Sequence, residues 1–178
     1  MHSKRLTSWL LGAWIGCSLF MFLIATHNFK AVPDLLAEPG GAKELIERLG
    51  PDGAKMLLRY HSSELNRFYF QAWEFVQIGV IAVVASLAWS TMGPRKTGRV
   101  LLVLIALILL AERSYITPEI VRIGRMMDFT PADTVSAARA QFWTLHGLYS
   151  GVEVLKVMLL AGLSLMLFSL RHDKGPQD

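Results

Sequence analysis

The stretch from 142 to 168, FWTLHGLYSGVEVLKVMLLAGLSLMLF, decides the fold class of this chain. It is long and apolar enough to cross the core of a bilayer, which takes about 20 helical residues. It nevertheless carries His146, Glu153 and Lys156 in its first half. Because charged side chains are costly against lipid, this stretch predicts a membrane helix that packs against other helices.

The rest of the chain supports a membrane protein. Its 178 residues are 53% hydrophobic and only 18% charged, and the mean hydropathy is +0.40, values that disfavour a soluble domain. Four apolar stretches predict spans at about 8–27, 69–90, 99–118 and 146–169. The first is longer than the apolar part of a signal peptide, so we expect it to be retained. The sequence predicts one all-α domain over 1–178, an integral membrane four-helix bundle.

The distribution of Lys and Arg predicts the orientation. The segment before span one, the link between spans two and three and the C-terminal tail together carry seven bases and two acids: Lys4, Arg5, Arg95, Lys96, Arg99, Arg171 and Lys174 against Asp173 and Asp178. Cytoplasmic loops hold such an excess of bases. We therefore expect a multi-pass protein of the inner (plasma) membrane with both termini cytoplasmic. The net charge of +4 reflects this asymmetry and predicts no nucleic-acid partner.

The two predicted outer loops, about 28–68 and 114–145, contain helical patterns. In the first loop the turn GPDG precedes a pattern from Ala54 to Trp89, which would rise roughly 54 Å as one helix. In the second loop Thr130 is a predicted N-cap and Pro131 the first residue of a helix that continues into span four. Helices 2 and 4 should therefore extend beyond the outer membrane face.

Polar side chains recur at helical spacing within the spans. At 100° per residue, one stripe on span four and one on span two each carry ionisable groups: His146, Ser150, Glu153, Val157, Leu160 and Ser164 on the former, and Arg67, Gln71, Glu74, Ile78, Ala82 and Ala85 on the latter. Spans one and three place polar residues at the same end. The sequence thus predicts a polar cluster in the outer third of the bundle, formed by His27, Gln71, Glu74, Glu112, Arg113, His146, Glu153 and Lys156.

Three interpretations of this cluster remain open. It can be a buried network that fixes helix packing, with Lys156 paired to Glu153, or a ligand or ion pocket that opens outward. It can also be a metal or haem site, for which His27, His146, Glu74 and Glu153 are the candidates. Three acids against two bases leave one negative charge in excess. A protonated histidine or acid, a metal, or a cationic ligand could balance that charge.

No nucleophile, phosphate-binding or dinucleotide motif occurs in the sequence, so an enzyme has no positive support. We expect a non-enzymatic integral membrane protein, an accessory subunit or a binding scaffold that contacts the lipid bilayer and other membrane subunits. No cofactor is expected under this hypothesis. The alternative is a membrane protein that binds haem or a divalent metal and takes part in electron transfer.

Three short segments carry a family resemblance: AWIGCSLFMFLIA in span one, ITPEIVRIGR after span three, and FWTLHGLYS at the start of span four. The chain resembles a bacterial membrane family of unknown function related to the transmembrane protein 205 family. The matching positions are Trp14, Gly16, Pro118, Ile120, Arg122, Phe142, His146 and Ser150. The resemblance implies a four-span helical membrane protein and no particular chemistry. The charged first outer loop departs from the family pattern.

Overall fold

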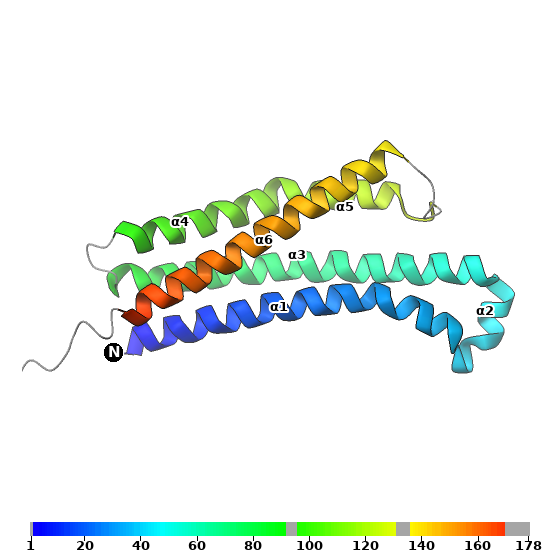
Figure 1. Cartoon of the computed structure of the whole chain (residues 1–178), viewed down its shortest axis with the longest axis horizontal. Coiled ribbons are helices and arrows are strands. Elements are labelled where there is room, and N and C mark those ends of the chain that lie inside the picture. Colours follow the sequence, from blue (N-terminus) through cyan, green and yellow to red (C-terminus); the bar gives the residue numbers. More distant parts are fainter. Residues whose placement is uncertain (1, 92–95, 131–135, 170–178) are drawn as a thin grey trace, which may run out of the picture.

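The computed structural model describes residues 2–91, 96–130 and 136–169. Within these residues every regular element is a helix, and the predicted all-α bundle is confirmed. Four helical segments are long and apolar enough to cross a membrane: Arg5–Ala37, Pro51–Trp89, Lys96–Met126 and Ala137–Leu167. They lie side by side along one axis (Figure 1), an arrangement that indicates a multi-pass membrane protein.

The first two long helices form a hairpin. Helix α1 (His2–Ala37) is followed by the short elements η1 (Gly40–Ala42) and α2 (Lys43–Leu49), and then by α3 (Pro51–Thr91). Gly50 has a φ of 73°, a conformation that glycine adopts without strain, and Pro51 then begins α3, a favourable position for proline. The predicted break at GPDG is therefore present. The α2 end of the hairpin lies opposite the N-terminus (Figure 1).

Helix α1 is longer than the predicted span. It continues past 27 to Ala37 with Pro33 inside it, and it bends in its last third (Figure 1), as an internal proline favours. The helix thus continues into the segment 28–37, which the sequence analysis assigned to the first outer loop, and this segment packs against α3. Asn28 donates to Asn66 Oδ1 at 2.6 Å, and Ser62 donates to the Asn28 carbonyl at 2.9 Å.

The third long segment is one rod built from three elements, α4 (Lys96–Ala111), η2 (Glu112–Ile116) and α5 (Thr117–Met126). Element η2 is a turn of π-helix, in which the Thr117 amide donates to the Glu112 carbonyl five residues earlier. Pro118 directly follows it and has no amide proton for the regular helical ladder. The rod therefore passes the predicted end near 118 and carries a local widening in its middle, a feature often found at functional sites.

The last long helix is α6 (Ala137–Ser169). Its N-cap is Ser136, whose hydroxyl accepts from the Arg139 amide at 3.2 Å. The helix was predicted to begin directly after Thr130, but the described helix begins at Ala137. Thr130 donates its amide to the Met127 carbonyl in a turn, and Pro131 lies outside the described residues. Figure 1 shows α6 packed along the bundle and returning to the end at which α1 begins.

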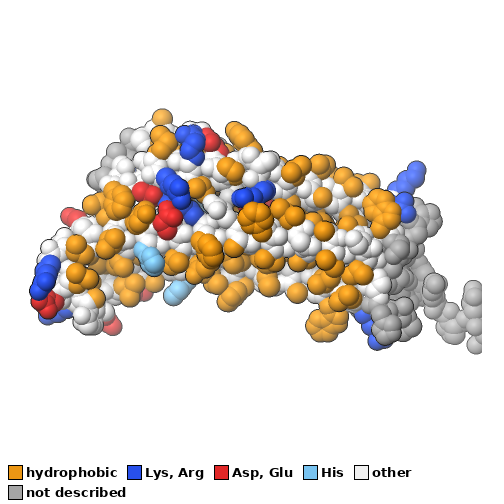
Figure 2. All heavy atoms as spheres, turned by 180° about the vertical axis from the view of Figure 1, so that it is seen from behind, with side chains coloured by type: hydrophobic (Ala, Val, Ile, Leu, Met, Phe, Trp, Pro, Cys, Tyr) orange, Lys and Arg blue, Asp and Glu red, His pale blue; other side chains and the backbone are white. Residues whose placement is uncertain are grey.

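The two halves of the bundle differ in what they bury. The half nearer the termini holds the apolar core: Leu11, Trp14, Ile81, Val84, Ala88, Leu102, Ile105, Leu109, Leu160, Leu163 and Leu167. Large apolar side chains also face outward, including Trp9, Phe22 and Leu165. Figure 2 shows hydrophobic side chains over much of one face, with acids and bases gathered towards the end away from the termini. Such a surface suits contact with lipid.

Candidate functional site: a buried ion network

Lys156 is the centre of the buried charge. Its side chain is 0% exposed, and its ammonium Nζ lies 2.6 Å from Glu112 Oε2 and 2.9 Å from Glu153 Oε1. Glu112 is equally buried, whereas Glu153 is 19% exposed. Glu112 belongs to η2 and Glu153 to α6, so the ammonium joins two helical segments. Two carboxylates in direct contact compensate the cost of burying a cation.

Tyr149 extends this contact towards α3. Its hydroxyl donates to Glu153 Oε1 at 3.1 Å, and its ring meets the edge of Phe70 with ring centroids 5.5 Å apart. Tyr149 is one turn before Glu153 on α6 and is itself buried. The Tyr149 hydroxyl therefore fixes the position of the Glu153 carboxylate, and the Tyr149 ring packs against α3.

A third acid, Glu74, lies on α3 and is fully buried. Its Oε1 accepts a short hydrogen bond from the Thr117 hydroxyl, and its Oε2 lies 3.8 Å from Arg113 Nη1. The Arg113 guanidinium also lies over the Phe75 ring, 4.4 Å from the ring centroid. These contacts join α3 to η2 and to the start of α5.

The π-turn explains how the α4–η2–α5 rod contacts both Lys156 on α6 and Glu74 on α3. Glu112 and Thr117 are both buried, although a regular helix would place two residues five positions apart about 140° from each other. The inserted residue widens the turn, so that Glu112 reaches Lys156 on α6 while Thr117 reaches Glu74 on α3. The only sequence feature that indicates a π-turn here is Pro118, which directly follows it.

The charges of the network do not cancel. Glu74, Glu112 and Glu153 face Arg113 and Lys156, which leaves one acid in excess, as the composition of the spans predicts. Glu74 Oε2 and Glu112 Oε1 are buried and form no hydrogen bond with any residue that the structure describes. A bound proton or a cationic ligand would balance the excess charge.

The other predicted site residues lie elsewhere. Gln71 is half-buried and lines a surface pocket with Arg113. The His146 ring stacks on Phe142 and meets Trp143 edge-on, at centroid distances of 5.8 and 5.7 Å, and forms no hydrogen bond with the described acids. His27 is exposed. Within 2–91, 96–130 and 136–169, no group of three His, Cys, Asp or Glu side chains could hold a metal ion.

Gln77 is a further buried polar residue that was not predicted. It is fully buried on α3 and accepts from Trp14 Nε1 of α1 at 3.2 Å. The buried face of α3 follows alternating steps of three and four residues: Glu74, Gln77, Ile81, Val84 and Ala88. The predicted stripe is therefore wrong after Glu74, since the side chains of Ile78 and Ala82 are exposed. On α6, likewise, Ser150 is exposed.

A separate ion cluster lies nearer the α2 end. Arg67 of α3 donates two hydrogen bonds to Asp128, at 2.8 and 2.9 Å, and one to Glu64 at 2.5 Å. The guanidinium lies close to Gly124 of α5, where a Cβ would come within 3.2 Å of Arg67 Nη2 and 3.4 Å of Phe142 Cε2. Glycine at this position lets α5, α3 and α6 approach closely.

Fold and site together define a four-helix membrane bundle with an ion network buried towards one end. Comparisons of the chain with family models, with curated proteins and with solved structures found no match.

Proposed function

We propose that this chain is a non-enzymatic integral membrane protein of the plasma membrane, an accessory subunit whose polar network fixes a scaffold for a membrane partner. The observation that carries the proposal is the fully buried contact of Lys156 with Glu112 and Glu153. These charges are engaged with one another across helices, as in a network that specifies helix packing. The resemblance to the bacterial relatives of the transmembrane protein 205 family, which remains a proposal, agrees with a four-span scaffold.

The proposed orientation places both termini in the cytoplasm. The end of the bundle that holds the start of α1 and the start of α4 carries Arg5, Lys96 and Arg99, and short cytoplasmic segments are rich in such bases. The opposite end, with α2 and the end of α5, then faces outward. In this orientation the ion network lies in the outer half of the membrane.

Helix α1 offers the best surface for a partner. In the most apolar stretch of α1, only 11% of the residues are buried within the bundle, against 28%, 33% and 22% in the other three spans. The uncovered face includes Phe20, Phe22 and Leu23. Apolar helix faces of this kind pack on other membrane helices as well as on lipid.

Photo-crosslinking in native membranes tests this role. A benzophenone amino acid replaces Phe22, which is 67% exposed on α1, and in a matched variant it replaces Leu107, which is 55% exposed on α4. We expect a discrete protein adduct from position 22 and a much weaker one from position 107. Lipid adducts alone from both positions would contradict an accessory-subunit role.

A further inference from the structure

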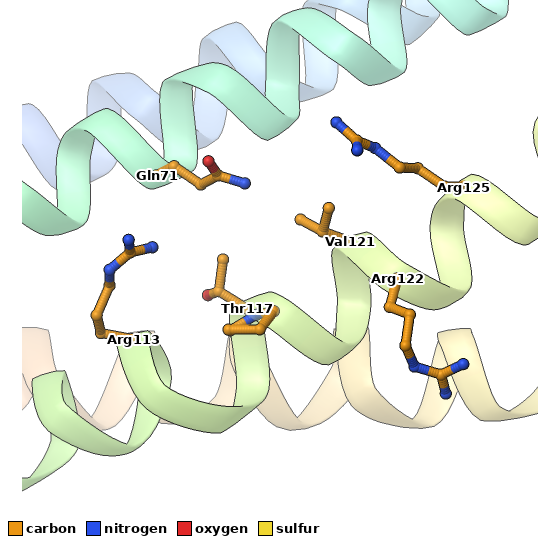
Figure 3. Close-up of a pocket in the computed structure, with 7 residues that line it drawn as sticks. Gln71, Arg113, Thr117, Val121, Arg122 and Arg125 are labelled. Atoms are coloured by element: carbon orange, nitrogen blue, oxygen red, sulfur yellow. The ribbon is translucent and has the colours of Figure 1, made fainter.

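A pocket of about 510 Å³ opens between α3 and α5, on the side of the bundle away from α1. Figure 3 shows Gln71 on one side and Arg113, Thr117 and Val121 on the other, with Arg125 reaching across from further along α5. The side chains that line the pocket are basic, neutral polar or apolar, and none is acidic. Guanidinium and amide groups in this lining can donate hydrogen bonds to an anionic group.

Two guanidinium groups at the pocket form no hydrogen bond with any residue that the structure describes. Arg122 also lines the pocket, but it donates twice to Glu119, at 2.5 and 2.9 Å, and its guanidinium points away in Figure 3. Arg113 and Arg125 lie 3.8 Å from Glu74 and 3.7 Å from Glu64, too far for hydrogen bonds. Within the described chain neither forms a hydrogen bond to an acid. Each carboxylate thus orients an arginine and leaves its donors available.

Apolar surface continues from the pocket along the bundle towards the termini. Phe75, under the Arg113 guanidinium, is 59% exposed, and Leu110, one turn before Arg113, is 63% exposed. On the same rod Tyr115 is 65% exposed, a position typical of aromatic residues at the boundary between lipid tails and headgroups. The basic pocket and the apolar surface therefore meet where a lipid changes from polar to apolar.

We propose that this pocket binds the phosphate of an anionic membrane phospholipid, with Arg113, Arg125 and Gln71 as donors and the acyl chains along Phe75 and Leu110. Arginine suits phosphate because its planar fork donates several hydrogen bonds at once. The apolar surface beside the pocket favours a lipid over a free phosphate ester. The inference rests on the proposed membrane role and names a ligand for the outer polar region.

Lipid retention in native mass spectrometry tests the proposal. Detergent-purified protein is titrated with phosphatidylglycerol, and with phosphatidylcholine as the zwitterionic comparison. Arg125→Gln is the primary variant, because Arg125 is 62% exposed and its loss should leave the fold intact. We expect roughly five- to tenfold weaker phosphatidylglycerol binding, the size of one lost charge-assisted hydrogen-bonding group. Arg113→Gln should weaken binding at least as much.

The matched control is Arg48→Gln, which removes one base from α2 at the same end of the molecule. Arg48 is 74% exposed, is paired with Glu44 and is not part of the pocket. Equal losses in Arg48→Gln and Arg125→Gln, no loss in Arg125→Gln, or no preference for phosphatidylglycerol over phosphatidylcholine would overturn the proposal. Competition by glycerol phosphate as strong as that by the lipid would also overturn it, by making a soluble phosphate the ligand. None of these results depends on partner cross-linking at Phe22, so the two proposals fail separately.

Discussion

Lys156 shows how a membrane helix can carry a charge in its middle. An ionised lysine left against lipid costs about 2.5–3.5 kcal/mol on insertion scales. Here its ammonium contacts Glu112 and Glu153 at hydrogen-bond distance and is shielded from the surface. Each of the three side chains can be buried only because the other two are present, so their contributions to stability are cooperative.

Removal of single charges from this contact should cost more than removal of a pair. We expect Glu112→Gln to lower the free energy of unfolding by about 3–5 kcal/mol, because it leaves Lys156 poorly compensated. Glu112→Gln combined with Lys156→Met should recover part of that loss. Glu153→Gln should cost less than Glu112→Gln, since Glu153 is partly exposed. Denaturant unfolding of the purified protein in detergent measures these three variants together with Lys156→Met alone.

The exposed pair of Arg48 and Glu44 is the control for these variants. Glu44→Gln should change the free energy of unfolding by less than about 1 kcal/mol, because exposed ion pairs contribute little. A double variant of Glu112 and Lys156 no more stable than the weaker single variant would show that the two side chains do not act as a pair.

At the scale of elements, α1 and α3 continue as a packed hairpin past the ends of the predicted spans. The side chains of Asn28 and Asn66 bond each other, and Asn66 also donates to the Ala25 carbonyl at 3.0 Å. Val32 and Ala54 are buried nearby. Polar contacts to a helix backbone hold the two helices together where their apolar pattern is weakest.

This hairpin should exchange its amide protons slowly. We expect protection at Val32, Leu58 and Leu65 in the unmodified protein, and exchange roughly tenfold faster there in Asn66→Ala, which loses two inter-helix hydrogen bonds of about 1 kcal/mol each. Ser63→Ala is the control, because the Ser63 hydroxyl bonds only the Arg59 carbonyl of its own helix. Fast exchange in the unmodified protein would mean that this end of the hairpin is not packed.

Much of the element pattern is predictable from the sequence. Spans two to four follow from apolar length, and the break before α3 follows from Gly50 and Pro51. The end of α1 could not be predicted, because Pro33 and the polar residues His27 and Asn28 signal a stop, and only the contacts with α3 override it. The cap of α6 was misplaced because Thr130 and Pro131 match a helix start as well as Ser136 does.

The members of the ion network were easier to predict than their geometry. A buried charge needs a partner, so Glu74, Glu112, Arg113, Glu153 and Lys156 were predictable as a group. Their pairing depends on the π-turn, which changes the faces of Glu112 and Thr117, and a constant 100° step cannot reproduce it. On α3 the error was the choice of face, because Gln77 and Ile78 lie on either side of Glu74 in a regular helix and the buried face continues through Gln77.

At the scale of the whole molecule, the two ends of the bundle differ in chemistry. The end with the starts of α1 and α4 carries Arg5, Lys96 and Arg99, and the ion network, the Arg67 cluster and the arginine pocket lie towards the other end. Figure 2 shows this separation on one face. The proposed roles of the network, the partner surface and the lipid pocket all require four membrane crossings with the α2 end outside.

Cysteine labelling in intact cells tests that requirement most directly. The native Cys17 is first replaced by serine, and single cysteines are placed at Gly53, near the start of α3, and at Thr97, near the start of α4. A Cβ at Gly53 would meet only Leu49 Cβ, at 3.8 Å, so the substitution is tolerated sterically. We expect a membrane-impermeant maleimide to label Gly53→Cys in intact cells and to label Thr97→Cys only after the cells are opened. Labelling of Thr97→Cys in intact cells, with Gly53→Cys protected, would contradict it.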